Sequence, residues 1–135
     1  MSEGLLDTNV FIHALTHDVH AEPCRGLLRA LAEGRAEAIL DAVVVHELTY
    51  VLPRFVKSMG RIDVAQYLTS VIAWDGVVAE KELLTEALRL WAAHPVGFID
   101  AYLAARAVRE ERPVYTRNAA DLRLCGATVP DPFPC

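Results

Sequence analysis

The chain has 135 residues, of which 53% are hydrophobic and 23% are charged, and its formal net charge at pH 7 is −5. This composition predicts a single globular domain over residues 1–135 and excludes a disordered chain. The apolar runs are too short and too charged to cross a bilayer, and the start of the chain lacks a signal peptide, so we expect a cytosolic protein without a membrane-spanning segment.

In chain order, short strands alternate with helices. The predicted strands are Gly4–Asp7, Ala38–Leu40, Gly76–Val78, Pro113–Tyr115 and Ala127–Val129. The predicted helices are Asn9–Leu15, Ala21–Glu33, Val43–Val56, Ile62–Trp74, Glu80–Ala93 and Gly97–Glu110, followed by a single turn around Ala119–Leu124. This alternation predicts an α/β fold with a short, mainly parallel central sheet covered by helices on both faces.

Local signals refine these elements. Gly34 ends the second helix, and Asp41 is positioned to cap the third. Pro53 is expected to kink or shorten that third helix. The segment Gly97–Glu110 is apolar nearly all round, which predicts a central, largely buried helix.

The cysteines are odd in number and widely spaced, at positions Cys24, Cys125 and Cys135. This spacing argues against a disulfide framework and against a structural zinc site. We expect Cys135, the last residue, to be a free and exposed thiol.

Several carboxylates occur at positions where a charged side chain is unexpected unless it has a partner or a ligand. Asp7 ends the first predicted strand, as in open α/β sheets that present a carboxylate at their ligand edge. Glu47 and Asp100 interrupt apolar helical segments, where burial is costly unless the charge is paired or bound to a cation. Asp121 and the neutral oxygen ligand Asn118 follow the fourth predicted strand. Right-handed crossovers would bring these segments to one edge of the sheet.

Such a set of acids suits a divalent cation. Carboxylates held close together repel each other, and a bound cation turns that repulsion into attraction. Mg²⁺ and Mn²⁺ prefer oxygen ligands, and either ion can activate a water molecule and orient a phosphodiester. The pattern therefore favours phosphodiester hydrolysis over zinc chemistry.

Each acid also has a simpler explanation. Asp7 can cap the following helix, and Glu47 can pair with an arginine on the flank of its helix. Asp100 can complement the dipole at a helix start, and Asp121 can make local hydrogen bonds in a turn. Together, in this order, the four acids favour one shared site.

Four segments that contain these acids resemble the PIN-domain family, most closely the small VapC-type toxins of toxin–antitoxin pairs. The matching segments are Leu5–Val10, Val45–Leu48, Ile99–Ala107 and Val114–Leu122. The resemblance implies a three-layer α/β/α PIN-like domain and a Mg²⁺- or Mn²⁺-dependent endoribonuclease.

The resemblance also implies roles for individual residues. Asp7 and Asp100 carry over as the principal metal ligands, and Glu47 as the third acid, which binds metal directly or through water or assists the nucleophilic water. Many relatives have an aspartate where this chain has Asn118, and Asp121 is the candidate to serve instead. The supporting polar residues would be Thr8, Asn9, Thr116 and Asn118.

The implied partners are an RNA substrate and a small antitoxin, whose peptide would lie in an apolar groove of the helices between Val10 and Val56. Apolar residues in Ile62–Trp91 also motivate a homodimer. The candidates for a local basic track are Arg25, Arg29, Arg54, Lys57, Arg61, Arg106, Arg109, Arg117 and Arg123. Most of these are expected on solvated helix faces, and core positions are favoured for Tyr50, Tyr102 and Trp74 over base stacking.

Other functions fit less well. A dehalogenase-like phosphatase needs a second aspartate where this chain has Asn9. A zinc site built from His17, His20 and Cys24 lacks a fourth ligand. The main competing hypothesis is a non-catalytic PIN-like module that binds protein or RNA.

Overall fold

The computed structural model describes residues 3–134, which form two compact units, one ending at Lys81 and the other beginning at Glu82. The first unit contains β1 (Gly4–Leu5), α1 (Thr8–Ala14), α2 (Ala21–Ala32), β2 (Ala38–Ile39), α3 (Ala42–Phe55), α4 (Arg61–Ala73) and β3 (Val77–Val78). The second unit contains α5 (Lys81–Ala93, which begins one residue before the boundary), α6 (Phe98–Glu110) and α7 (Ala119–Leu124). The predicted α/β fold class, with a short parallel sheet and covering helices, is confirmed.

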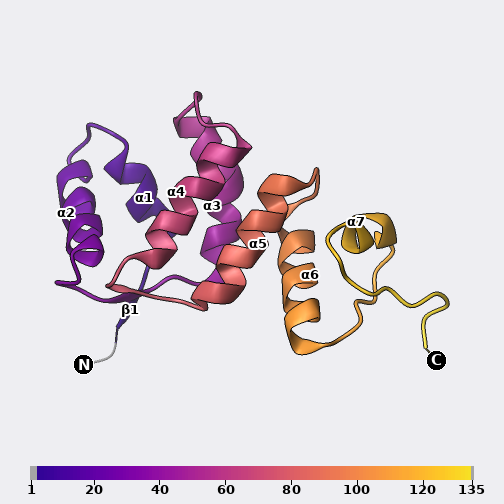
Figure 1. Ribbon diagram of the computed structural model, residues 1–135. Helices are drawn as coiled ribbons and strands as arrows, with labels where there is room; N and C mark the ends of the chain where they lie inside the picture. Colours follow the sequence, from indigo (N-terminus) through magenta and orange to yellow (C-terminus); the bar gives the residue numbers. More distant parts are fainter. Residues whose placement is uncertain (1–2, 135) are drawn as a thin grey trace. The chain divides into compact units, whose positions relative to one another are not determined.

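The sheet lies in the first unit and has the order β1-β2-β3, with both pairs parallel (Figure 1). Gly4 is paired with Ala38, and Ala38 with Val77. Both crossovers step the same way across the sheet, so right-handed connections carry α1 to α4 over one face.

The first strand is shorter than the predicted Gly4–Asp7. The Leu6 N–H still donates to the Ile39 carbonyl at 2.9 Å, and the Leu6 side chain is buried. Asp7 instead becomes the N-cap residue of α1. The strand therefore delivers this carboxylate to a helix start.

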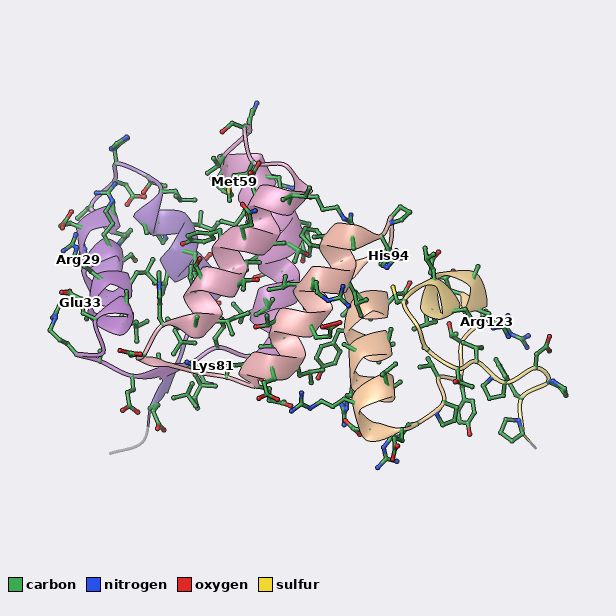
Figure 2. All side chains as sticks on the ribbon, in the orientation of Figure 1. Arg29, Glu33, Met59, Lys81, His94 and Arg123 are labelled. Carbon is green, nitrogen blue, oxygen red and sulfur yellow. The ribbon has the colours of Figure 1, made fainter. Side chains whose placement is uncertain are left out.

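Helix packing forms the core of the first unit. In Figure 1, α1 lies between α2 and α3, and α3 contacts α4. The fully buried side chains in this core include Phe11, Leu31, Leu48, Leu52 and Leu68. Polar residues occupy the opposite face of α2, where Arg29 projects into solvent, as does Glu33 directly after the helix (Figure 2).

Two local signals of the first unit, Gly34 and Asp41, are confirmed, whereas the effect expected of Pro53 stays a prediction. Gly34 follows α2 with a φ of 74°, a left-handed conformation that glycine adopts without a steric penalty. The Asp41 carboxylate caps α3 by accepting from the Val43 N–H at 2.9 Å. Pro53 lies in the last turn of α3, which ends at Phe55.

Two predicted strands are wrong. Pro113–Tyr115 and Ala127–Val129 are irregular, and they are joined by a hydrogen bond from the Val114 N–H to the Thr128 carbonyl at 2.9 Å. Pro113 has no N–H to donate to a ladder, and Pro130 ends the second segment. The two segments therefore touch without forming a regular strand pair.

The prediction that Gly97–Glu110 is largely buried is also wrong. Its buried face is made mostly of small residues, namely Ala101, Ala104, Ala105 and Ala107. Phe98 is the large apolar side chain of α6 that is buried, whereas Ile99, Leu103 and Val108 are exposed. Phe98 and the alanines form the packing face, and the count of apolar residues concealed this asymmetry.

Among residues 3–134, none of the helices combines the length and apolar character needed to cross a membrane. Cys24 is half-buried and Cys125 is buried, and both are free thiols. Cys135 lies outside the described residues.

Candidate active site

Asp7 and Asp41 occupy the same kind of position, because each is the N-cap residue of a helix with extended backbone angles. Asp41 uses its carboxylate to cap α3, whereas the Asp7 side chain makes no capping hydrogen bond. Asp7 is also exposed and has no ion pair among residues 3–134. Capping therefore does not explain Asp7, and its carboxylate remains available to a ligand.

The two residues after Asp7 are the predicted supporting residues Thr8 and Asn9. Thr8 is 4% exposed, and its Oγ1 atom has no hydrogen-bond partner within residues 3–134. Burying a hydroxyl without a hydrogen-bond partner lowers the stability of the fold, so such groups are rare in folded proteins. The Thr8 hydroxyl is one of these rare groups, and it directly follows the exposed acid Asp7. Asn9 is exposed on the first turn of α1.

Glu47 lies on α3, a helix that contacts α1. Its side chain is half-buried, and no arginine pairs with it in the part of the chain that the structure describes. The simpler explanation, an ion pair on the helix flank, is therefore wrong. The first unit thus has two acids, Asp7 and Glu47, with no side-chain partner among the described residues.

In the second unit, one amide holds two acids together. Asn118 Nδ2 donates to Asp100 Oδ2 at 2.7 Å and to Asp121 Oδ2 at 2.9 Å. The hydroxyl of Thr116 fixes the same residue, because it accepts from the Asn118 N–H at 2.9 Å. The predicted residues Thr116, Asn118, Asp100 and Asp121 are therefore brought together.

This cluster has an unpredicted neighbour, Cys125. The thiol is 6% exposed, and burial, followed by the negative charges of Asp100 and Asp121, raises its pKa above the ordinary value. The thiol therefore lies within electrostatic reach of both carboxylates. Its position directly after α7, the helix that carries Asp121, was the available sequence signal.

None of the four candidate acids is fully buried, although Glu47 and Asp100 lie in apolar helical segments. Asp7 is exposed, and Glu47, Asp100 and Asp121 are only half-buried. Asp7 and Asp100 lie at helix starts, where unpaired N–H groups and solvent both favour a negative charge. The convergence of Asp7 and Glu47 upon Asp100 stays a prediction.

Most of the arginines predicted as candidates for a basic track are already engaged. Arg25 and Arg29 pair with Glu22, Arg106 pairs with Glu110, Arg109 pairs with Glu82, and Arg123 donates to the Val129 carbonyl. Arg54 and Arg117 differ, because neither has an ion pair with any residue in 3–134 and each lies over an aromatic ring.

The preference for a core position at Tyr50 is wrong, because this residue is 46% exposed. It lies seven residues after Val43, which is also exposed, and therefore on nearly the same side of α3. Helical spacing from Val43 and Glu47 was the signal that could have identified this exposed face.

A groove of about 310 Å³ lies between α5 and α6 in the second unit. Its lining includes Leu90 and Val108, and the arginines at its rim, Arg89 and Arg109, pair with glutamates. None of the four predicted acids lines it. This groove therefore does not coincide with the chemistry that the sequence predicts.

The donor set fits a hard cation in its chemistry. Neither unit, within residues 3–134, contains by itself three His, Cys, Asp or Glu side chains grouped to hold a metal ion. The acids Asp7 and Glu47 offer unengaged oxygens, and Asn118 presents its amide nitrogen to the two acids, which leaves its carbonyl oxygen without a partner. Oxygen donors of this kind are those that Mg²⁺ and Mn²⁺ prefer.

Comparison with protein-family models gives a match to the PIN domain over residues 4–123. The matched region contains all four acids and extends across both compact units. No curated protein matches the chain.

Proposed function

Because the chain belongs to the PIN-domain family, whose members are generally nucleases, we propose that it is a Mg²⁺- or Mn²⁺-dependent endoribonuclease. We place it in the cytoplasm as the toxin of a type II toxin–antitoxin pair. The observation that carries the proposal is the family match over residues 4–123, which includes Asp7, Glu47, Asp100 and Asp121. The unengaged carboxylates of the first unit support it, since a free acid suits a cation.

The proposed roles follow from what each side chain offers. Asp7 and Asp100 bind the cation through carboxylate oxygens, and Glu47 binds it directly or through water, or accepts a proton from the attacking water. When bound, the ion supplies an activated water and offsets negative charge on the phosphodiester.

In this proposal, Asn118 and Asp121 do not bind the cation themselves but act through Asp100. The Asn118 amide orients Asp100 by donating to its Oδ2 atom, and Asp121 accepts the second N–H of the same group. Groups that orient a metal ligand commonly affect metal affinity and activity by about 10- to 100-fold. Asp121 therefore sets the direction in which Asp100 presents its free oxygen.

The test is cleavage of total cellular RNA by the purified chain, with end mapping of the products. We expect cleavage with Mg²⁺ or Mn²⁺, none with EDTA, and none by the Asp100→Asn variant. The Asp41→Asn variant is the matched control, because Asp41 is an exposed helix cap on another helix start. Wild-type protein that binds RNA but leaves it intact with either metal would instead establish the non-catalytic module.

The antitoxin proposal rests on exposed apolar side chains in the first unit, including Leu15, Val19 and Leu27. An amphipathic helix or a strand from a small partner would cover such a surface. Co-expression with the neighbouring reading frame, followed by copurification, tests this part. A neighbouring gene whose product does not copurify contradicts it.

The homodimer proposal has lost much of its support. Most apolar residues of Ile62–Trp91 are buried in the protein itself, whereas Ile62 and Val78 are exposed. Light scattering at micromolar concentration tests it, and a monomeric mass contradicts it.

A further inference from the structure

One face of α3 combines an acid, an aromatic ring and a cation. Glu47, Tyr50 and Arg54 are three and seven residues apart, and at about 100° per residue they fall within roughly 60° of one another. Tyr50 is 46% exposed, Arg54 is exposed, and Glu47 is half-buried. At about 1.5 Å per residue, the ring and the guanidinium follow Glu47 by about 5 and 10 Å along the axis.

The Tyr50 ring is held on two sides. The His46 ring lies edge-on to it, with centroids 5.4 Å apart and an interplanar angle of 67°. The Arg54 Cζ atom lies 5.9 Å from the Tyr50 centroid, within the range of a cation–π contact. A ring restrained in this way loses little conformational entropy when a ligand binds to its exposed part.

Arg54 differs from the other exposed arginines of this unit. Arg29 and Arg35 have carboxylate partners in Glu22 and Glu33, whereas Arg54 has none among residues 3–134. An aromatic ring does not neutralise the charge of a guanidinium. Arg54 therefore carries an uncompensated positive charge in a protein whose formal net charge is −5.

We propose that Tyr50 and Arg54 bind single-stranded RNA beside Glu47, with a base stacked on the Tyr50 ring and a phosphate bound by the Arg54 guanidinium. This proposal rests on the ribonuclease activity proposed above and names two residues that hold its substrate. Proteins recognise single-stranded RNA by stacking its bases on aromatic rings and by binding its phosphates with cations. The α3 face offers both groups, one and two turns from a proposed catalytic acid.

Charge favours RNA over a protein partner on this face. A guanidinium binds a phosphate through parallel N–H donors, and such a pair is stronger than a neutral hydrogen bond. The Glu47 carboxylate repels a phosphate unless a cation lies between them, whereas the Arg54 guanidinium attracts one. The proposed pairing of Arg54 with a phosphate would thus allow a chain with a negative net charge to bind RNA.

The test measures binding of a short, labelled, single-stranded RNA of mixed sequence in EDTA, over a series of salt concentrations. We expect Tyr50→Leu to weaken binding about tenfold or more, as loss of a stacking platform does, and Tyr50→Phe to retain wild-type affinity. We expect Arg54→Gln to reduce the slope of log K against log salt by about 0.7, the contribution of one phosphate contact on a single strand. Arg35→Gln, an exposed arginine of the same unit that pairs with Glu33, is the charge-matched control and leaves both quantities unchanged.

The outcomes separate this proposal from the proposed function. One outcome overturns the RNA-binding face alone: the wild-type protein cleaves RNA, and the Tyr50→Leu and Arg54→Gln variants bind RNA as tightly and with the same salt dependence as the wild type. Unchanged RNA binding with loss of a copurifying protein partner also overturns it and assigns the face to that partner. Wild-type protein that neither binds nor cleaves RNA overturns both proposals. If Tyr50→Leu does not fold, the salt slope of Arg54→Gln still decides.

Discussion

The acids of the two units differ in how their charge is balanced. In the second unit, Asp100 and Asp121 both accept from the amide of Asn118, at 2.7 and 2.9 Å. In the first unit, Asp7 and Glu47 have no side-chain partner among residues 3–134. The second unit therefore gives its two candidate acids an internal donor, whereas the first unit leaves Asp7 and Glu47 to water or to a ligand.

This difference allows the effect of a substitution on stability to be distinguished from its effect on activity. A substitution in the Asn118 cluster removes hydrogen bonds, so it changes the free energy of unfolding as well as any activity. A substitution at Asp7 or Glu47 removes no such bond, so its effect on stability is small. Each prediction below tests one side of this difference.

The largest expected effect is on cleavage by Asp7→Asn and Asp100→Asn. Each substitution removes a proposed metal ligand, and groups that merely orient ligands already affect activity by about 10- to 100-fold. We therefore expect kcat/KM on RNA to fall by more than about a hundredfold in both variants. Thermal unfolding in EDTA should show only a small change in the Tm of Asp7→Asn, because its carboxylate makes no capping hydrogen bond and only its interaction with the helix dipole is lost.

The Asp41→Asn variant is the control for both measurements, because this carboxylate accepts a capping hydrogen bond from Val43. It should retain cleavage and lose a little stability, since asparagine is also a good N-cap residue. Cleavage by Asp7→Asn at the wild-type rate would contradict its assignment as a ligand.

A smaller effect is expected from Asp121→Asn. Asp121 reaches Asp100 only through Asn118, so its removal loosens the orientation of a ligand without deleting one. We expect about a tenfold decrease in kcat/KM, which should be partly recovered at higher Mg²⁺ concentration. A loss as large as that of Asp100→Asn would instead make Asp121 a direct ligand.

Much of the fold could be predicted from the sequence. Helix spacing and punctuation located α2, α3, α4 and α5 closely, because periodic apolar residues and residues such as Gly34 act locally. The strands were less predictable, since each needs a partner distant in sequence. Pro113–Tyr115 has strand-forming residues, but Pro113 cannot donate to a ladder.

The site was predictable in its residue types and less so in its environment. The order of the acids indicated the family, and the amide at Asn118 was recognised as a departure from it. The sequence did not reveal that this amide donates to two carboxylates, because that depends on how α6 and α7 present Asp100 and Asp121. Exposure of Tyr50 was missed because α3 is apolar on more than one side.

An effect of about 1 kcal/mol on the free energy of unfolding is expected from Asn118→Asp in EDTA. The substitution replaces an N–H donor by a third carboxylate, and exposure to solvent screens part of the repulsion. Mg²⁺ should reverse the loss, because a ligand that binds the folded state stabilises it. Denaturant unfolding with and without Mg²⁺ measures both effects.

Asn9→Asp makes the same chemical change in the first unit and serves as the control. Asn9 is exposed in the first turn of α1, where the helix dipole favours an acid and its side chain makes no hydrogen bond within residues 3–134. We expect little change in EDTA. Equal destabilisation by Asn9→Asp and Asn118→Asp would mean that the two units do not differ in how they balance charge.

The smallest effect, and the most specific, is expected from Thr8→Val. The Thr8 hydroxyl is buried without a partner among residues 3–134, so its replacement by a methyl group of similar shape should stabilise the protein by up to about 1 kcal/mol. Thr49→Val is the matched control, because its buried hydroxyl donates to the His46 carbonyl at 2.6 Å and its loss should cost about 1 kcal/mol. If the Thr8 hydroxyl is kept beside Asp7 to contact a bound ligand, the Thr8→Val variant gains stability while its cleavage of RNA falls severalfold. The Thr49→Val variant loses stability, and its cleavage of RNA is unchanged. A Thr8→Val protein that is less stable than wild type would show that the hydroxyl has a partner in solution, and the first unit would then balance its polar groups as the second does.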